Sequence, residues 1–191
     1  MTDSARTDRG KAQGFLIRLR GDRRGVSAVE FALLAPIMIA FYFALTEFCQ
    51  AYMSQKRVAH AASAVGDLVA QTDIVTQDQL DDIIAIGGLI MKPFDSTSLT
   101  TRISSVTRDA NGVAKVDWSR AKGIAVLAPK SIVTVPDGVI SNGQSLVMAE
   151  TTYEYKSAVQ YLMPAVTKFS RVFYLRPRRV EMVLCTDCPT T

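Results

Sequence analysis

An uninterrupted apolar segment near the N-terminus is the strongest constraint on how this chain folds. Residues 26–46 run for 21 residues with a single charged side chain, Glu30. A helix of that length extends roughly 32 Å, which matches the hydrocarbon thickness of a bilayer. A cleavable secretory signal has a shorter apolar core that ends at a small-residue cleavage site, and none follows Thr46. We therefore expect residues 26–46 to form a retained transmembrane helix.

The charges that precede this segment predict its orientation. Residues 1–25 contain seven Lys or Arg and three Asp, which accounts for the whole formal net charge of +4, and the rest of the chain is balanced. Nucleic-acid-binding proteins carry their excess positive charge on the folded body, so this distribution argues against nucleic-acid binding. Basic residues beside a span mark its cytoplasmic side. We expect residues 1–25 to be a cytoplasmic leader and the residues after the span to be exported.

Glu30 is the most informative residue of the apolar segment. A carboxylate inside a bilayer costs on the order of several kcal/mol unless it is paired, protonated or close to the headgroups. Either Glu30 has a function within the membrane, or it is tolerated at a shallow depth. It lies five residues after Gly25, which ends the basic leader, and the residues between them are small or aliphatic.

The run RRGVSAVEFALLAP, residues 23–36, resembles the N-terminal signature of the TadE/TadG-like minor pseudopilins of tight-adherence (Flp, type IVc) pilus systems. The resemblance is specific over about residues 20–70 and only architectural beyond. In that family a prepilin peptidase cuts after the Gly, which implies a cut between Gly25 and Val26. Major pilins of this class usually have Tyr after the Glu. This chain has Phe31, which favours a minor subunit.

The resemblance also implies a function and partners. The protein would be a structural pseudopilin of the bacterial inner membrane, without a cofactor, for assembly of an adhesive pilus. Its partners would be the prepilin peptidase, other pilins and pseudopilins, the inner-membrane assembly platform and membrane lipid. Cleavage would leave a cationic amine on Val26, which Glu30 of the same or a neighbouring subunit could neutralise. The alternative is a single-pass membrane protein whose exported domain binds a partner and never enters a fibre.

Two further residues of the first helix carry expectations. Pro36 removes the hydrogen bond to the Ala32 carbonyl and is expected to kink the helix, either harmlessly or as a hinge. Membrane helices tolerate proline better than soluble helices do. Glu47 follows the span, and we expect it to be a solvated charge at the membrane interface.

Residues 47–70 are expected to extend the first helix outside the membrane, because apolar residues continue at three- and four-residue spacing. That narrow, alanine-rich stripe needs a partner surface, and the C-terminal sheet of the same chain is the candidate. The stripe comprises Phe48, Ala51, Gln55, Val58, Ala62, Val65 and Val69.

Residues 71–191 are expected to form a small exported α+β domain. A capping box at residues 76–79 predicts a second helix that ends near Pro93. Period-two patterns and turn residues then predict five or six strands, mostly antiparallel, with a short helix at residues 161–166. The fold class is therefore α+β: a long N-terminal helix, membrane-spanning in its first half, packed on a small sheet in a pilin-like lollipop. The strands are expected at residues 99–105, 113–118, 131–135, 147–155, 169–175 and 180–184.

Catalytic and metal-binding patterns are scarce, so we predict neither an enzyme nor a metal site. His60 is the only histidine, and it lies on the long helix with no nearby nucleophile motif. Cys185 and Cys188 form a Cys-x-x-Cys pattern that occurs in redox, zinc and disulfide sites. We expect a small disulfide loop, which leaves Cys49 unpaired. The basic run at residues 176–179 is expected to be a solvated face, or else a contact for acidic neighbours or for anionic lipid.

Overall fold

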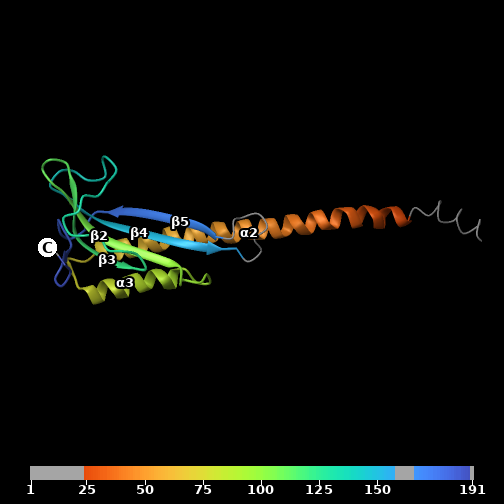
Figure 1. Ribbon diagram of the computed structural model, residues 1–191, viewed down its shortest axis with the longest axis horizontal. Helices are drawn as coiled ribbons and strands as arrows, with labels where there is room; N and C mark the ends of the chain where they lie inside the picture. The colour runs from red at the N-terminus through yellow and green to blue at the C-terminus, as the bar shows by residue number, and fades with distance from the viewer. Residues whose placement is uncertain (1–23, 158–165, 190–191) are drawn as a thin grey trace, which may run out of the picture. The chain divides into compact units, whose positions relative to one another are not determined.

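The computed structural model describes residues 24–157 and 166–189. The chain divides into two units, Met1–Thr46 and Glu47–Thr191. The expected short helix at residues 161–166 lies almost entirely outside the described residues. The elements are in chain order α2 (Arg24–Ala70), β1 (Ile74–Val75), α3 (Gln77–Ile90), β2 (Leu99–Arg108), β3 (Ala114–Lys122), β4 (Ser145–Lys156), β5 (Val166–Leu175) and β6 (Leu184–Cys185). Figure 1 labels all of them except the two-residue strands β1 and β6.

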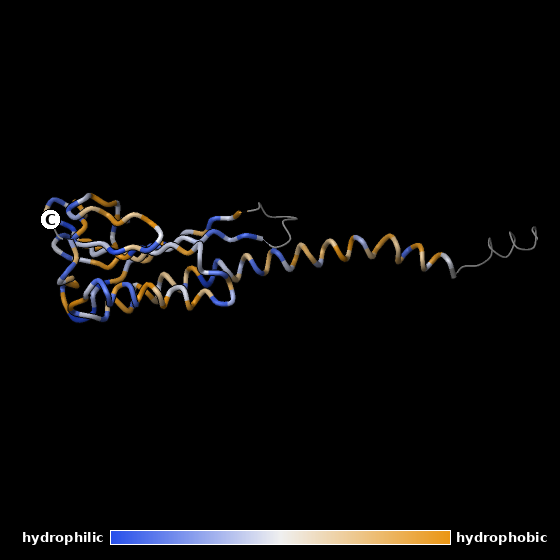
Figure 2. Tube along the Cα trace, turned by 60° about the horizontal axis from the view of Figure 1, so that its bottom comes forward, coloured by the Kyte–Doolittle hydropathy of each residue, from blue (hydrophilic) through white to orange (hydrophobic). Residues whose placement is uncertain are grey.

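The described part of the first unit is one helix, the beginning of α2. Its apolar side chains point outward on every side, and Phe31 is 73% exposed. Figure 2 shows the hydrophobic colouring of this part of α2. Within the described residues, α2 is the one helix that is long and apolar enough to cross a membrane. These properties are consistent with single-pass membrane anchoring.

The second unit is built on a four-stranded antiparallel sheet in the order β3-β2-β4-β5. Strand β4 has the alternation that the sequence predicts, since the side chains at every second position from Val147 to Tyr155 are buried. A separate pair, β1 and β6, is parallel and joins residues 110 apart along the chain. The predicted α+β class, with a long helix packed on a small, mostly antiparallel sheet, is confirmed.

Helices α2 and α3 cover the same face of this sheet. Their buried apolar residues form a core with the inward side chains of β2, β3 and β4, among them Ile103, Trp118 and Val147. The segment between β3 and β4 covers part of the opposite face, where Val135 and Ile140 are buried in a second cluster. Both faces of the sheet are therefore partly shielded from solvent.

The second half of α2 approaches the sheet closely because its stripe is made of small residues. At Gly66, an added Cβ would lie 2.5 Å from Leu175 Cδ1 and 3.0 Å from the Ala149 Cβ. The predicted stripe is largely confirmed, but its first position is wrong, because Phe48 is 61% exposed. The buried residues of the stripe are Ala51, Ser54, Val58, Ala61, Ala62, Val65, Val69 and Ala70.

Helix α3 begins as the sequence predicts. Thr76 is its N-cap, with the reciprocal Thr76 and Gln79 bonds of a capping box. The helix continues through Gly87, where the lack of a side chain permits close packing, since an added Cβ would lie 3.1 Å from Val65 Cγ2. It ends at Ile90, shortly before Pro93 as expected.

Two predicted strands are wrong. Residues 131–135 contain only an isolated bridge between Ile132 and Lys115, although Ser131 and Val133 also form backbone hydrogen bonds with β3. Of residues 180–184, only Leu184 enters a strand, the two-residue β6. Both segments have the β-branched composition of strands but run over the edge or face of the sheet, so apolar composition alone misassigns them.

We expect Gly66→Leu to destabilise the second unit, because the added side chain would overlap Leu175 and Ala149. Overpacking of this kind costs about 1–3 kcal/mol, or roughly 2–4 °C in Tm for each kcal/mol in a domain of this size. Circular dichroism of the detergent-purified chain would measure Tm. Gly88→Leu is the matched control, since the nearest atom to its added Cβ is Ser96 Oγ at 3.7 Å. Equal Tm values for the two variants would contradict the close packing at Gly66.

Candidate functional site

The N-terminal candidate residues lie in the first turns of α2. Helix α2 begins at Arg24, so Gly25, Val26 and Glu30 all belong to regular helix. Val26 and Glu30 are four residues apart and therefore lie on the same face of successive turns. No atom lies within 4 Å of the position that a Cβ on Gly25 would occupy, and Val26 is 54% exposed. Within the described part of the chain, nothing covers the bond between Gly25 and Val26.

Glu30 is exposed on the surface of α2, and no ion pair or hydrogen bond to it is present among residues 24–157 and 166–189. Its neighbours on the helix surface are apolar, with Phe31 and Leu34 both exposed. A carboxylate in such a setting is available to a cation that the described residues do not supply. Pro36 follows within the helix, which continues through it.

Glu47 does not have the solvated position that the sequence analysis predicts. Its side chain is 2% exposed, and the hydroxyl of Ser157 donates a hydrogen bond to its Oε1. Burial, followed by the negative charge of Glu47, raises the pKa of the neighbouring Tyr155 above its usual value. The sequence analysis could not foresee this position, because the hydrogen-bond partner Ser157 lies 110 residues further along the chain. Glu47 does precede Ala51 by four residues, and that spacing is the one signal that places it in the buried stripe.

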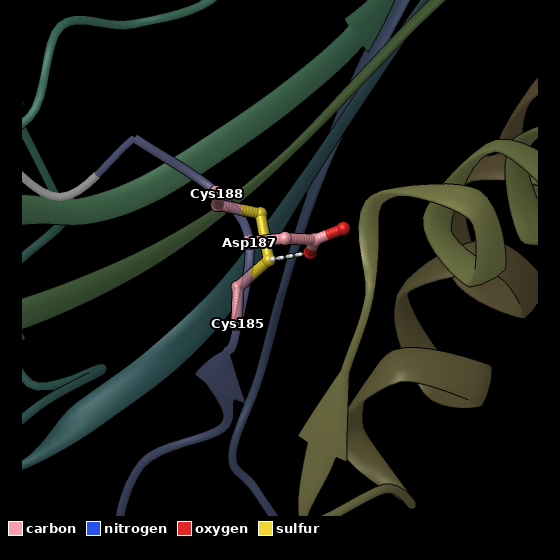
Figure 3. Close-up of side chains that lie close together, drawn as sticks. All are labelled: Cys185, Asp187 and Cys188. Carbon is pink, nitrogen blue, oxygen red and sulfur yellow. Dashed lines mark hydrogen bonds between the residues drawn. A yellow bond between two sulfur atoms is a disulfide. The ribbon is translucent and has the colours of Figure 1, made fainter.

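A second candidate region is the C-terminal loop that contains the Cys-x-x-Cys pattern. Cys185 and Cys188 are joined by a disulfide, with Asp187 between them (Figure 3). These three residues are the group within the described chain that could hold a metal ion. They do not fit a metal, because zinc and similar ions bind thiolates and both sulfurs are bonded to each other.

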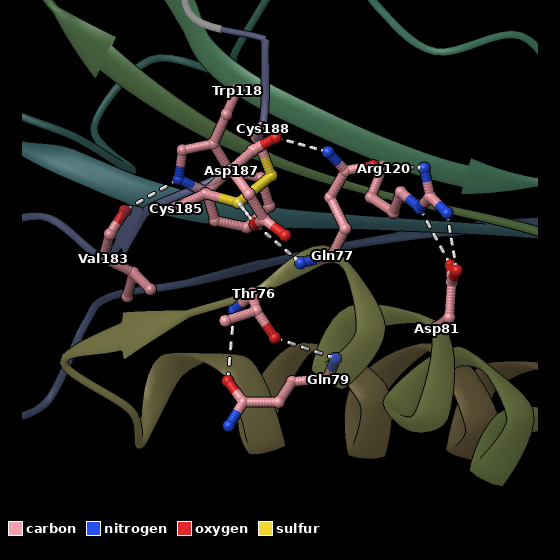
Figure 4. The surroundings of a disulfide bond; sticks show 10 residues. All are labelled: Thr76, Gln77, Gln79, Asp81, Trp118, Arg120, Val183, Cys185, Asp187 and Cys188. Carbon is pink, nitrogen blue, oxygen red and sulfur yellow. Dashed lines mark hydrogen bonds and ion pairs between the residues drawn. A yellow bond between two sulfur atoms is a disulfide. The ribbon is translucent and has the colours of Figure 1, made fainter.

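The loop instead caps α3. Asp187 accepts a hydrogen bond from the backbone N–H of Gln77 at 2.9 Å, and its own carbonyl accepts one from the Gln77 side chain. Gln77 is the first residue of α3, so a carboxylate lies where the unpaired N–H groups and the helix dipole favour negative charge. Figure 4 shows the disulfide and the N-terminus of α3 side by side.

Helix α3 and strand β3 are joined next to this cap. Arg120 Nε donates to Asp81 at 2.8 Å, and Arg120 Nη1 donates to the Gln77 side-chain oxygen at 2.7 Å (Figure 4). The hydrogen bond from Arg120 holds the pKa of Asp81 below its usual value. Nearby, Trp118 donates to the Val183 carbonyl at 2.7 Å. These contacts hold α3, β3 and the C-terminal loop together, and the sequence analysis missed them because the residues come from three segments far apart in the chain.

Three further residues or segments singled out in the sequence can be located in the structure. His60 is exposed on α2, and Cys49 is exposed and free. The three arginines of the basic run at residues 176–179 are exposed, as a solvated face requires. Arg178 also forms an ion pair with Asp67, and its backbone N–H donates to the Ala70 carbonyl at 2.9 Å. The acidic partner of Arg178 therefore lies on the same chain.

Comparison with known families bears on the first candidate region. Residues 25–67 match the model of the TadE-like protein family. The matched segment begins at Gly25, the predicted last residue of the leader, and continues through the apolar half of α2 into its packed half. No curated protein and no solved structure gives a match. The resemblance seen in the sequence is confirmed over this segment.

The TadE-like match indicates a protein related to Tad pili, and this family is a structural one rather than an enzyme family. The match ends at residue 67 and leaves the sheet, α3 and the disulfide loop outside it. Within the matched residues, the chemically distinctive groups are therefore Gly25, Val26, Glu30 and the buried Glu47.

We expect one reactive cysteine in the native, mature protein. Alkylation without reductant should add one label, on the exposed Cys49, because Cys185 and Cys188 are joined to each other. Unfolding with reductant should add three labels, as read by intact mass. Cys49→Ser is the control and should take no label without reductant. Labelling of Cys185 or Cys188 in the unreduced protein would contradict the disulfide.

Proposed function

We propose that this TadE-like protein is a minor pseudopilin, cut after Gly25 by a prepilin peptidase and used in the assembly of an adhesive Tad pilus. The observation that carries the proposal is the family match that begins at Gly25 and spans the helix containing Glu30. Gly25 is followed by a helix whose apolar side chains are exposed along residues 26–46. Such a surface suits either lipid or the apolar helices of neighbouring subunits.

In this proposal the chain has four parts. Residues 1–25 form a cytoplasmic leader, residues 26–46 span the inner membrane, residues 47–70 extend the helix into the periplasm, and residues 71–191 form the periplasmic domain. The excess of basic residues in the leader supports this orientation. The prepilin peptidase, other pilins and pseudopilins, the assembly platform and lipid are the proposed partners.

The proposed chemistry of assembly is a charge pair. Cleavage creates an amine on Val26, one helical turn from Glu30, at the start of a helix whose exposed side chains are mostly apolar up to residue 46. An ion pair is stronger in a low-dielectric setting, and either charge left there alone is costly. A helix displaced along its axis would leave both charges unpaired, so a pair formed between neighbouring subunits would select one register.

The processing step is tested by N-terminal sequencing of the chain after co-expression with a prepilin peptidase. The mature protein should begin at Val26, whereas Gly25→Leu should remain uncut. The fold tolerates that change because the space around Gly25 is open, so loss of cleavage would report on the protease and not on misfolding.

Ser27→Ala is the matched control and should be cut normally. A wild-type chain that keeps its first 25 residues would favour the alternative, an uncut single-pass membrane protein whose exported domain binds a partner. Cleavage at another bond would also contradict the proposed site.

The charge pair is tested by Glu30→Gln, which keeps the size of the side chain and removes its charge. We expect normal insertion and cleavage but at least a roughly tenfold loss of assembled pili, measured in sheared surface fractions. A loss of about 1.4 kcal/mol in the interaction between subunits lowers their association constant by a factor of ten. Glu30→Asp keeps the charge and should assemble better than Glu30→Gln. Full assembly by the Gln variant would rule out the pairing.

A further inference from the structure

The β5 edge of the four-stranded sheet is open. Strand β5 pairs with β4 over ten residues, from Val166 to Leu175, without a register shift. It is the last strand of the sheet order, and Figure 1 shows it along the outer side of the sheet. Among the described residues, no backbone hydrogen bond connects β5 to anything other than β4. The strand is roughly 34 Å long. One of its carbonyls, that of Ser170, accepts a hydrogen bond from the exposed Arg171 side chain at 3.1 Å, which an incoming strand could displace.

The opposite edge of the sheet, formed by β3, is partly covered by the chain itself. Lys130 N–H donates to the Val116 carbonyl at 2.7 Å, and Val116 N–H donates to the Ser131 carbonyl at 3.0 Å. Val133 N–H then donates to the Ala114 carbonyl at 3.0 Å. A segment of the chain itself thus covers the start of β3. Proteins commonly block exposed strand edges with such cover, with bulges, with proline or with charged side chains. Of these, β5 has only charged side chains, those of Lys168 and Arg171.

The β5 edge is basic. From residue 166 to residue 180 the chain carries five Lys or Arg and no acidic residue. Only Arg178 of these forms an ion pair among the described residues. Lys168 lies opposite Glu154 of β4, whereas Arg171 lies opposite Thr151 and is exposed. The charge disfavours pairing with a second copy of β5, since like charges on neighbouring strands repel, and it favours an acidic strand.

We propose that β5 binds an extended, acidic segment of a neighbouring protein, which adds to the sheet as a fifth strand. Main-chain hydrogen bonds would supply most of the affinity, and alternate side chains would supply the specificity. Because Lys168 and Arg171 lie on opposite faces of the strand, acidic residues on both faces of the added segment would find a partner. This inference does not depend on cleavage at Gly25 or on entry into a fibre.

The experiment uses the full chain in lipid nanodiscs and a synthetic ten-residue peptide. Threonine and glutamate alternate in the peptide, so that the glutamates lie on one face of the added strand. One threonine is replaced by glutamate, which places a negative charge on the other face as well. Hydrogen exchange of the amides of residues 166–175 should slow by roughly tenfold with the peptide. Fluorescence anisotropy should show binding that weakens with salt. The same peptide with alternate backbone nitrogens methylated should not bind, because it cannot complete the ladder.

A charge-reversed variant, Lys168→Glu with Arg171→Glu, should bind a lysine peptide in place of the glutamate peptide. Lys130→Glu, an exposed change at the covered edge, is the matched control and should leave binding unchanged. The proposal is overturned if wild-type β5 is not protected by the glutamate peptide, or if the methylated or lysine peptides bind equally well. It is also overturned if β5 is protected without peptide in a dimer, since the occupant would then be a second copy.

Discussion

The close packing of α2 on the sheet is the constraint on which the second unit depends. Its stripe of alanine, valine and glycine lets the helix backbone approach β4 and β5, and at Gly66 an added Cβ would lie only 2.5 Å from Leu175 Cδ1. A core built in this way has little spare volume, so its stability comes from fit more than from the area of large side chains.

Polar contacts hold the elements together at positions where apolar packing is absent. Asp187 caps α3, Arg120 ties α3 to β3, and Ser157 supplies a hydrogen bond to the buried Glu47. A buried carboxylate without such a partner would be strongly destabilising. Each of these contacts joins segments that are distant in the chain, and together they determine how the elements around the sheet are positioned.

Local patterns were enough to predict much of the fold. The capping box of Thr76 and Gln79, the alternation along β4 and the small-residue stripe each depend on neighbours within a few residues. The apolar segment with Glu30 after Gly25 was likewise readable, and the TadE-like match covers it.

The errors came from partners far along the chain. Glu47 was expected to be solvated because its partner Ser157 lies 110 residues away and is not visible in the local sequence. Residues 131–135 were expected to form a strand, but they only cover the edge of β3. The role of Asp187 was missed for the same reason, since nothing near Gln77 in sequence reveals that the carboxylate reaches it. Composition indicates what a segment can form, but its tertiary partner decides what it does form.

The cap on α3 has a consequence for the order of folding. Residues 74–77 lie early in the second unit, yet their partners are residues 184–187, so neither β1 nor the start of α3 is complete until that late segment arrives. Helix α3 therefore stays incomplete at its N-terminus until residues 184–187 are in place. Contacts of such long sequence separation slow folding, so closure of the cap is a late step in the folding of the second unit.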